Sequence, residues 1–461
     1  MGLFDRACRR LIHPLWARHE DPRAAVLQRE LSRRQFDAPA VIRARQRAAL
    51  RRLLRHAAAT VPYYRERFAR TGVRPEDIAT EEDFRSIPLL AKTDIRRHGR
   101  QMLSEAHQGG SLRLKQTSGS TGVPLEVWQD AQCWDWKRAC TLRSDEWSGW
   151  RRGQRIAKLW GVTAGERFNQ KKALRAALYE RTLYLNTLKI GPADIDRYAA
   201  KLRRLRPELL HGHAHSVFLL ADHLYRTGQP AYRPRGIITT AMVLHDWQRR
   251  RIEHVFGCPV TNRYGCEEVS LIACECSEHR GMHVNADSVL LEVVAGDRPA
   301  RPGEEGAVVV TDLSNFAMPL IRYQIGDVAI ATDQACPCGR GLPILESVVG
   351  READYVLTPA GDLVSGISLT DNFASNVPGL AQLQIVQEEV RRFLFRIVRD
   401  ADFTAASERR IGELVAHFFG PGVEYRCEFV DRIPQQLSGK YRFCISHVHA
   451  PSTAPGGRAA A

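Results

Sequence analysis

Long hydrophobic runs are absent from this sequence of 461 residues. No stretch approaches the roughly 18 uncharged apolar residues that a membrane-spanning helix needs. The segment Met1–Arg6 lacks the apolar core of a signal peptide, and Arg6 stands where a myristoylation motif requires Ser or Thr. The 11 cysteines form an odd total, which does not fit a disulfide framework in a chain without a secretion signal. We therefore expect a cytoplasmic protein with no transmembrane segment.

Basic residues interleaved with aromatic residues, the pattern of a nucleic-acid-binding stripe, are also absent. The net charge is nevertheless +15, with 67 Lys and Arg against 52 Asp and Glu. The excess consists largely of Arg spread along the chain, with pairs such as Arg9-Arg10 and Arg33-Arg34 on helical patterns. An excess of basic residues is also found in proteins that bind nucleic acid or an anionic membrane. We interpret this excess as a solvated, Arg-rich surface and expect no nucleic-acid partner.

Hydrophobic periodicity predicts an α/β fold with a large N-terminal domain of layered sheets. Leu50 and Leu53 belong to a helical pattern that should end before Val61–Tyr64. The apolar segment Gly236–Thr240 predicts a buried strand, and an Arg-rich helix follows at Asp246–Val255. Strand and helix in this order indicate parallel α/β layers.

The composition changes after residue 350, and the remainder predicts a small α+β domain. It has an alternating strand at Phe393–Val398, a helix at Ala405–Phe419 and a further strand at Glu424–Val430. We divide the chain into a helical N-terminal part at 1–110, a core at 111–350, a small C-terminal domain at 351–450 and a disordered tail at 451–461.

A loop rich in glycine and hydroxyl groups is the most specific local signal. It contains Thr117, Ser118, Gly119, Ser120, Thr121 and Gly122, followed by Val123-Pro124. Two glycines let backbone N–H groups turn toward an anion, and four hydroxyls can bind phosphate or magnesium. It is not a Walker A loop, because no Lys-Ser/Thr follows the second glycine. The strand pattern Leu112–Gln116 runs directly into it, which favours a phosphate loop over an ordinary turn.

Four further segments follow in a fixed order. They are Tyr264-Gly265-Cys266-Glu267-Glu268, Arg322-Tyr323-Gln324-Ile325-Gly326-Asp327, Gly350-Arg351-Glu352-Ala353-Asp354 and Leu437-Ser438-Gly439-Lys440-Tyr441-Arg442. Together with the loop they resemble the adenylate-forming (ANL) superfamily, and within it the phenylacetate–CoA ligase-like, CapK-type branch of AMP-dependent ligases. The resemblance covers nearly the whole chain. It implies a large AMP-binding domain, which would include 111–350, and a small mobile C-terminal domain that carries the catalytic Lys.

The resemblance implies a role for each segment in nucleotide binding and catalysis. Tyr264 and Gly265, with Ala241, would bind the nucleotide, and Glu268 would hold Mg²⁺. Asp327 would accept hydrogen bonds from the ribose hydroxyls, although it would also suit the cap of a strand-ending turn. In the remaining segments, Arg351 would contact the nucleotide, Asp354 would be the pivot between the domains, Lys440 would be catalytic, and Thr121 would act within the phosphate loop.

Two positions depart from the pattern of the superfamily. Leu125 follows the proline of the phosphate loop, where many members have Lys. Met242 stands where related sequences often carry an acidic residue, after Thr239-Thr240-Ala241. If that residue normally touches adenine, the nucleotide contact differs in this chain.

A Cys/His cluster in two halves predicts a metal site. The candidates are Cys274, Cys276, His279, His283, Cys336 and Cys338. Tetrahedral zinc takes four nitrogen or sulfur ligands, and we choose Cys276, His283, Cys336 and Cys338, with Cys274 and His279 as alternates. A closed four-ligand site would be structural rather than catalytic. The alternative is that these cysteines are small buried side chains in a reducing cytosol.

Three histidines, His211, His213 and His215, alternate in sequence. This spacing places them on one face of an extended strand. Without acidic or Cys partners nearby in the sequence, they suit the wall of an acyl pocket better than a metal site. That pocket would include Trp160 and Ala241.

These observations favour an AMP-forming acid–CoA ligase that uses ATP, Mg²⁺, CoA and structural zinc. Carboxylic acid and ATP would give acyl-AMP, and CoA would then displace AMP. The alternative enzyme would pass the acyl or AMP group to an amine, a hydroxyl or a carrier protein in polysaccharide or secondary-metabolite biosynthesis. A more remote alternative is a non-catalytic, zinc-bearing, basic nucleic-acid-binding protein. The sequence leaves open the acid, the acceptor, the pathway, the effect of Met242 and the oligomeric state, including a homodimer.

Overall fold

The computed structural model describes residues 8–20, 22–107, 111–116, 125–160, 175–187, 192–351, 355–359, 363–365, 369, 373, 376–433 and 444–448. The chain forms two compact units, a large one that ends at Val348 and a small one that begins at Val349. Among the described residues, no helix combines the length and the apolar composition that crossing a membrane requires.

Helices dominate the first hundred residues of the large unit. The main helix ends at Thr60 and the next begins at Pro62, as the periodicity predicted, because proline fits the first turn of a helix but not its interior. The elements are η1 (Cys8–Ile12), α2 (His13–Glu20), α3 (Pro22–Arg34), α4 (Pro39–Thr60), α5 (Pro62–Thr71), α6 (Glu81–Arg85), α7 (Lys92–His98), η2 (Gly99–Met102) and η3 (Glu105–His107).

A short hairpin and a long helix follow. Strand β1 (Arg113–Gln116) pairs antiparallel with β2 (Glu126–Gln129), so that Gln116 lies opposite Glu126. Helix α8 (Ala131–Trp147) begins at Asp130, whose carboxylate accepts a hydrogen bond from the backbone N–H of Cys133 at 2.7 Å. Such a cap satisfies a backbone donor that the first turn leaves without a partner.

One sheet of 12 strands organises the described part of the large unit. Its spatial order is β11-β10-β12-β13-β14-β9-β8-β7-β6-β5-β3-β4. The strands from β4 to β7 are parallel, whereas β7, β8 and β9 pair antiparallel, as do β13, β12, β10 and β11. The strands are β3 (Ile156–Trp160), β4 (Thr182–Asn186), β5 (Leu209–His213), β6 (Gly236–Thr240), β7 (Val260–Cys266), β8 (Ser270–Glu275), β9 (Met282–Val284), β10 (Val289–Ala295), β11 (Arg298–Pro299), β12 (Glu305–Asp312), β13 (Tyr323–Ala331) and β14 (Ile344–Arg351).

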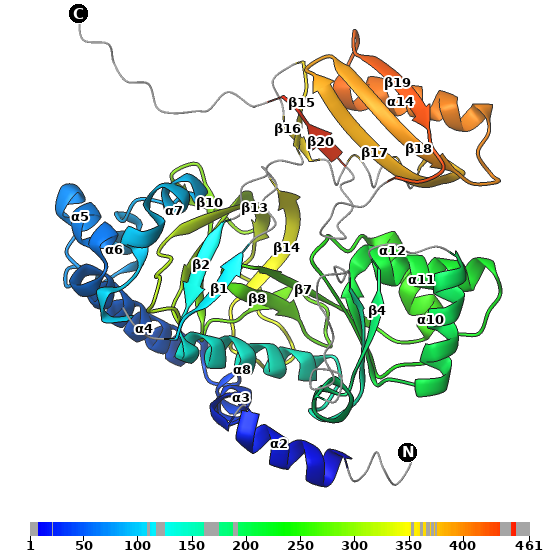
Figure 1. The fold of residues 1–461 in the computed structure, drawn as a ribbon. Helices are drawn as coiled ribbons and strands as arrows, with labels where there is room; N and C mark the ends of the chain where they lie inside the picture. Colours follow the sequence, from blue (N-terminus) through cyan, green and yellow to red (C-terminus); the bar gives the residue numbers. More distant parts are fainter. Residues whose placement is uncertain are drawn as a thin grey trace, which may run out of the picture. The chain divides into compact units, whose positions relative to one another are not determined.

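The parallel half of the sheet has helices on both faces, which is typical of parallel strands. Helices α10 (Pro192–Leu205), α11 (Ala214–Arg226) and α12 (Asp246–Phe256) cover one face through an apolar core that includes Leu159, Leu210 and Ile237 (Figure 1). Helix α8 covers the other face, where its Leu142 packs with Ile238. A short π-helix, η4 (Ala176–Glu180), precedes β4. The expected parallel α/β layers are therefore present.

The N-terminal helices hold the antiparallel half of the sheet in place. The hydroxyl of Tyr64 donates to the carbonyl of Pro319 at 3.0 Å and accepts from the backbone N–H of Ile321 at 3.1 Å. The guanidinium of Arg322 donates to the carbonyls of Arg85 and Ile87, both at 2.6 Å. These contacts fix the chain at the start of β13, which carries part of the site described below.

The small unit is an α+β domain. Its four-stranded sheet has the order β19-β18-β17-β20, with β17 and β18 antiparallel and the two outer pairs parallel. Thr404 caps the helix that packs on this sheet, and Phe393, Phe395 and Ile411 lie in the core between them. The elements are β15 (Tyr355–Leu357), β16 (Leu363–Ser365), β17 (Leu380–Glu389), β18 (Arg392–Arg399), α14 (Ala405–Phe419), β19 (Glu424–Phe429) and β20 (Cys444–Ser446).

Candidate functional site

Tyr264 and Asp327, which are distant in sequence, meet between β7 and β13. The hydroxyl of Tyr264 donates to the carboxylate of Asp327 at 2.8 Å. Both side chains are largely buried, with 9% of Tyr264 and 7% of Asp327 exposed. A carboxylate held in this way keeps its orientation, and its remaining lone pairs can accept hydrogen bonds from a diol.

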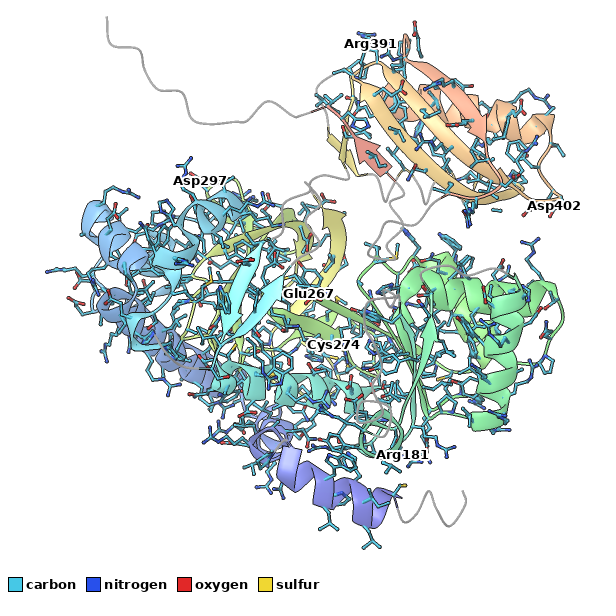
Figure 2. All side chains as sticks on the ribbon, viewed as in Figure 1. Arg181, Glu267, Cys274, Asp297, Arg391 and Asp402 are labelled. Atoms are coloured by element: carbon cyan, nitrogen blue, oxygen red, sulfur yellow. The ribbon has the colours of Figure 1, made fainter. Side chains whose placement is uncertain are left out.

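Glu268 is the inward carboxylate of the Glu267-Glu268 pair. Glu267 is more than half exposed and pairs with Lys115 of β1 at 3.4 Å (Figure 2). Glu268 is 4% exposed and accepts a hydrogen bond from the hydroxyl of Tyr323 at 2.8 Å. Burial and the Glu268 charge raise the pKa of Tyr323, so this phenol remains a donor.

The backbone of Glu268 is anchored as well. Its carbonyl accepts hydrogen bonds from the side-chain amide of Gln129 at 3.3 Å and from the ammonium of Lys137 at 3.4 Å. Lys137 also forms a buried ion pair with Asp312 at 2.8 Å. Helix α8 and strands β2 and β12 therefore converge on the backbone that presents the Glu268 carboxylate.

Gly265 occupies a position that excludes a side chain. A Cβ atom there would lie 2.4 Å from the carbonyl oxygen of Ser270 on β8. The pairing of β7 with β8 shifts register between Tyr264 and Gly265, and Ser270 has a φ of 65°. A bulge of this kind re-aims neighbouring side chains, and the glycine lets the two backbones approach.

Ala241 follows β6 with a φ of 67°, in the left-handed region that non-glycine residues seldom occupy. Such conformations concentrate at ligand sites. The adjacent Met242 packs against the core between the parallel strands and their helices. At this departure from the family pattern, the side chain is therefore part of an apolar layer.

Several predicted residues lie outside the described part of the chain. They are the phosphate-loop residues Thr117, Ser118, Gly119, Ser120, Thr121 and Gly122, the pivot Asp354, the catalytic Lys440, the tail 451–461 and the side chain of Arg351. The backbone of Arg351 ends β14. The roles assigned to these residues stay predictions.

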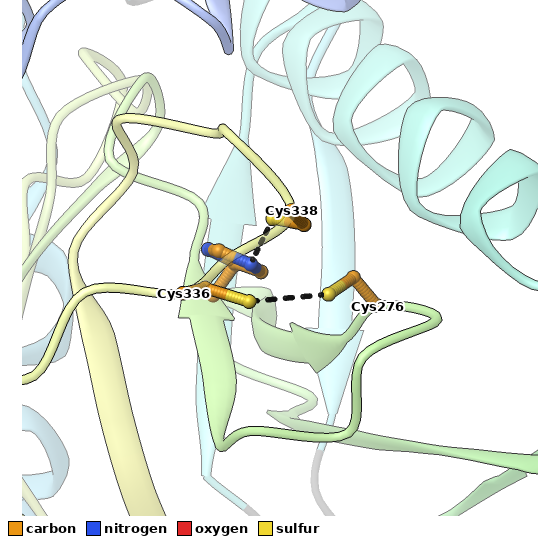
Figure 3. A group of neighbouring side chains, drawn as sticks. Cys276, Cys336 and Cys338 are labelled. Atoms are coloured by element: carbon orange, nitrogen blue, oxygen red, sulfur yellow. Dashed lines mark hydrogen bonds between the residues drawn. The ribbon is translucent and has the colours of Figure 1, made fainter.

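The four preferred metal ligands are brought together by the fold. The ligand atoms of Cys276, His283, Cys336 and Cys338 all lie within 4.8 Å of one another (Figure 3). The sulfur atoms of Cys276 and Cys336 are 3.6 Å apart, and the sulfur of Cys338 is 3.2 Å from Nε2 of His283. Cys276 follows β8, His283 belongs to β9, and the two remaining cysteines belong to the loop before β14.

The pKa values of the cluster residues shift in different directions. Burial lowers the pKa of His283 to about 4, with Arg340 and Arg143 adding to the effect, so the imidazole is neutral. Burial raises the pKa of Cys276 to about 12. Burial also acts to raise the pKa of Cys338, but hydrogen bonds from the backbone and guanidinium of Arg340 prevail and lower it.

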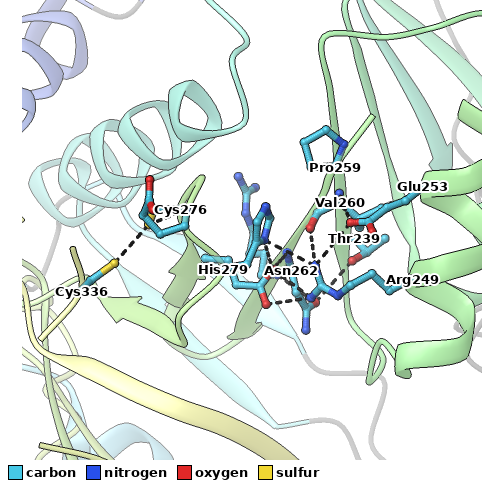
Figure 4. Close-up of polar contacts among 12 residues, drawn as sticks. Thr239, Arg249, Glu253, Pro259, Val260, Asn262, Cys276, His279 and Cys336 are labelled. Atoms are coloured by element: carbon cyan, nitrogen blue, oxygen red, sulfur yellow. Dashed lines mark hydrogen bonds and ion pairs between the residues drawn. The ribbon is translucent and has the colours of Figure 1, made fainter. Parts of the chain in front are cut away.

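The alternates Cys274 and His279 lie outside this cluster. Cys274 is fully buried on β8, and burial raises its pKa to about 12 (Figure 2). Nδ1 of His279 lies 3.3 Å from the carboxylate of Glu275, which Arg249 binds through two hydrogen bonds at 2.8 and 3.0 Å (Figure 4). This network joins α12 to β8. Among the described residues, the metal-ligand set therefore consists of Cys276, His283, Cys336 and Cys338.

The prediction of three histidines on one strand face was wrong for the third. Strand β5 ends at His213 and α11 begins at Ala214, so His215 belongs to a helix. His211 and His213 do share a face of β5, and the ring of Trp160 on β3 lies 5.7 Å and 4.3 Å from their rings. The helical spacing of the buried residues Val217, Leu220 and Leu224 is the signal that marks α11 in the sequence.

Sequence reasoning missed the residues that support the site from a distance. Lys137 and Asp312 carry no motif, and their pairing across α8 and β12 leaves no local pattern. The same holds for Arg263, which pairs with Asp145 in the interior. Tyr323 lies within a recognised motif, and only the fold reveals its contact with Glu268.

Comparisons with known proteins find a matching family model and related sequences. A family model described as the CapK C-terminal domain matches residues 356–447. The phenylacetate–coenzyme A ligase of Thermus thermophilus is 28% identical over 326 residues, which are 68% of this chain and 72% of that protein. Protein CapK of Staphylococcus aureus is 24% identical over 380 residues, which are 80% of this chain and 81% of that protein.

Solved structures agree on the fold. The 2-hydroxyisobutyryl-CoA ligase in its postadenylation state, in complex with R3-HIB-AMP, has a TM-score of 0.69 and 20% sequence identity, over 87% of this chain and 88% of that chain. ATP-bound MatB from Rhodopseudomonas palustris has a TM-score of 0.50 and 16% identity, over 72% and 66% of the two chains. The predicted α/β class with large layered sheets is confirmed. These matches confirm the resemblance to adenylate-forming enzymes of the phenylacetate–CoA ligase-like, CapK-type branch.

Proposed function

We propose that this protein activates a carboxylic acid with ATP as an acyl-AMP and then transfers the acyl group to CoA. The observation that carries the proposal is the convergence of Tyr264 and Glu268 from one motif with Tyr323 and Asp327 from another. The relatives named phenylacetate–coenzyme A ligases support the reaction type. So does the solved 2-hydroxyisobutyryl-CoA ligase, which was captured with an acyl-AMP.

In the first step, a carboxylate oxygen attacks the α-phosphorus of ATP, and the bond from that phosphorus to the β-bridging oxygen breaks. Pyrophosphate leaves with the electron pair. Asp327, held by Tyr264, accepts hydrogen bonds from the ribose hydroxyls, and the Tyr264 ring faces the adenine. Glu268 is the buried carboxylate suited to a magnesium ion, which would neutralise phosphate charge when bound.

Two further roles rest on the motifs alone. We assign phosphate binding to the loop Thr117–Gly122, with Thr121 among its hydroxyl groups, and to Lys440 the stabilisation of charge between the attacking carboxylate and the α-phosphate. An ammonium there lowers the repulsion between two anions as they approach.

In the second step, the CoA sulfur attacks the acyl carbon and the bond from that carbon to the AMP oxygen breaks. AMP leaves, and the thiol proton passes to solvent. Asp354 is the pivot that lets the small unit change its position between the two steps, and Arg351 contacts the nucleotide. ATP, CoA and reduced thiols occur together in the cytoplasm, which is where we place the reaction.

The Cys/His cluster fits structural zinc. A tetrahedral site with Zn–S bonds of about 2.3 Å places its sulfur atoms about 3.8 Å apart, close to the 3.6 Å between Cys276 and Cys336. The fourth ligand, His283, is fully buried, so the set leaves no open position for a substrate. Zinc would link β8 and β9 to the loop before β14 and would take no part in the reaction.

The experiment that tests the proposal is pyrophosphate release from Mg-ATP across a panel of aryl, short-chain and hydroxy acids, with and without CoA. We expect acid-dependent release in the wild type, with turnover that requires CoA, and loss of release in Lys440→Ala. An unchanged rate in that variant would contradict the role of Lys440.

A second candidate is adenylation with a different acceptor, such as an amine, a hydroxyl or a carrier protein. The match of residues 356–447 to the CapK C-terminal domain and the similarity to protein CapK support it, because that name, unlike the names of the ligases, does not specify CoA. Pyrophosphate release that depends on an acid but does not respond to CoA would select this candidate over the CoA ligase.

A further inference from the structure

A cavity of about 150 Å³ lies between α8 and the parallel strands, apart from the metal cluster. That volume is far above the roughly 15 Å³ needed to hold one water molecule. Its lining contains four cationic side chains, Arg138, Arg152, Lys158 and Arg263, against the carboxylates of Asp145 and Glu180. The side chains that line the cavity therefore carry more positive than negative charge.

Neither of the two carboxylates that line the cavity lies within ion-pair distance of Lys158. Asp145 pairs with Arg263, and Glu180 lies 3.5 Å from Arg175. Among the described residues, no carboxylate lies within 4.0 Å of Nζ of Lys158, whose contact is the Tyr184 ring with its centroid 5.7 Å away. Burial lowers the pKa of Lys158. An anion placed beside this ammonium would offset the cost of burying it.

His211 stands beside Lys158 on the adjacent strand. The two residues are paired in the register of β3 with β5, so their side chains share a face. Nε2 of His211 is buried and has no hydrogen-bond partner among the described residues. Burial, with the charges of Arg263 and Lys158, lowers the pKa of His211 well below its usual range, so the ring is neutral and Nε2 can donate as one tautomer.

The cavity lies on the same strand face as the expected acyl pocket, but deeper in the sheet. Trp160 follows Lys158 by two residues on β3, a rise of about 7 Å along the strand. Its ring packs on His211 and His213 at the carboxyl ends of the parallel strands, where ligands bind in such sheets. Lys158 and His211 therefore lie one layer below the carboxyl ends of the strands. An acyl chain that enters at the strand ends would extend toward these two residues.

We propose that the acid activated by this enzyme carries a second carboxylate at its far end, and that Lys158 and His211 bind it in this cavity. The inference rests on the proposed function, because it assigns the cavity to the acid. Lys158 supplies the charge, and Nε2–H of His211 supplies a directed hydrogen bond. Apolar monocarboxylic acids of the same length would leave both groups without a partner, which the site disfavours.

The test compares matched acids in the pyrophosphate-release assay. The dicarboxylic series succinate, glutarate, adipate and pimelate is run against butyrate, valerate, hexanoate and heptanoate, and 4-carboxyphenylacetate against phenylacetate. We expect one dicarboxylic acid to exceed its monocarboxylic partner in kcat/KM. Lys158→Met should reduce that ratio by about tenfold or more, since a hydrogen bond to a charged group is lost, and Lys158→Arg should retain most of it.

The matched control is Lys201→Met on α10, which removes the same charge from the helices on the opposite face of the sheet. It should leave the ratio unchanged. Activation of monocarboxylic acids alone, or a ratio that Lys158→Met does not alter, would overturn the inference and leave the proposed function standing. No acyl-AMP from either series would instead remove the proposed function itself.

Discussion

The substitution Lys137→Met tests how much the buried ion pair between Lys137 and Asp312, which lies next to the candidate site, contributes to stability. Lys137 is 6% exposed and its ammonium lies 2.8 Å from the carboxylate of Asp312, which is fully buried. Burial acts to lower the pKa of Lys137 and Asp312 acts to raise it, and the net shift is upward. Removing one partner of such a pair leaves a buried charge uncompensated and costs about 3–5 kcal/mol. That is a large part of the roughly 5–15 kcal/mol that stabilises a typical domain.

The assay is urea unfolding followed by tryptophan fluorescence, with Arg74→Met as the control. Arg74 also pairs with a carboxylate, that of Asp77 at 2.7 Å, but 70% of the Arg74 side chain is exposed, so no measurable change is expected. The double variant Lys137→Met, Asp312→Asn should lose less stability than the sum of the single changes, because the unpaired charge is removed. A midpoint for Lys137→Met equal to that of the control would refute the reasoning.

Three other predictions concern the site and the cluster. Tyr264→Phe should raise the KM for ATP by about tenfold or more, because Asp327 loses a hydrogen bond to a charged group. Gly265→Ala should lower kcat/KM strongly, since its Cβ would collide with a backbone carbonyl, whereas Gly99→Ala, with open space around it, should not. Cys336→Ser should reduce the zinc that co-purifies with the protein, measured by mass spectrometry, and should lower the unfolding midpoint.

Each of these predictions has an outcome that contradicts it. Equal KM values for ATP in Tyr264→Phe and the wild type would mean that the hydrogen bond to Asp327 does not position the ribose. Equal activity in the two glycine variants would show that the backbones of β7 and β8 can separate without cost. Zinc retained in full by Cys336→Ser, or absent from the wild type, would count against the four-ligand site.

The order of the motifs allowed the family and the fold class to be predicted from the sequence. The pairing of Tyr264 with Asp327 was not predicted, since each residue was assigned to the nucleotide separately. For the metal cluster, the spacing gave six candidates, and the structure brings four of them together because β8, β9 and the loop before β14 are neighbours. Cys274 lies within β8 and packs in the same apolar cluster as Cys276, but it does not belong to the four-ligand group.

Other features could not be read from local patterns because they depend on tertiary neighbours. Lys137 sits within α8, where a lysine would ordinarily face solvent, and only the packing of β12 against this helix explains its burial. Lys158 and His211 lie side by side because β3 and β5 are adjacent parallel strands. Their pairing depends on the register of these strands, which the sequence does not show. Sequence alone places His211 in an acyl pocket but does not show that a lysine accompanies it.

The central claim is that the chain forms an acyl-AMP, and exchange of labelled pyrophosphate into ATP tests it most directly. The exchange requires the first step to run in both directions and requires no CoA. The account predicts exchange that depends on the acid, is strongest with a dicarboxylic acid, and is lost in Lys440→Ala. Absence of exchange with every acid, in a protein that binds ATP by calorimetry, would contradict the claim.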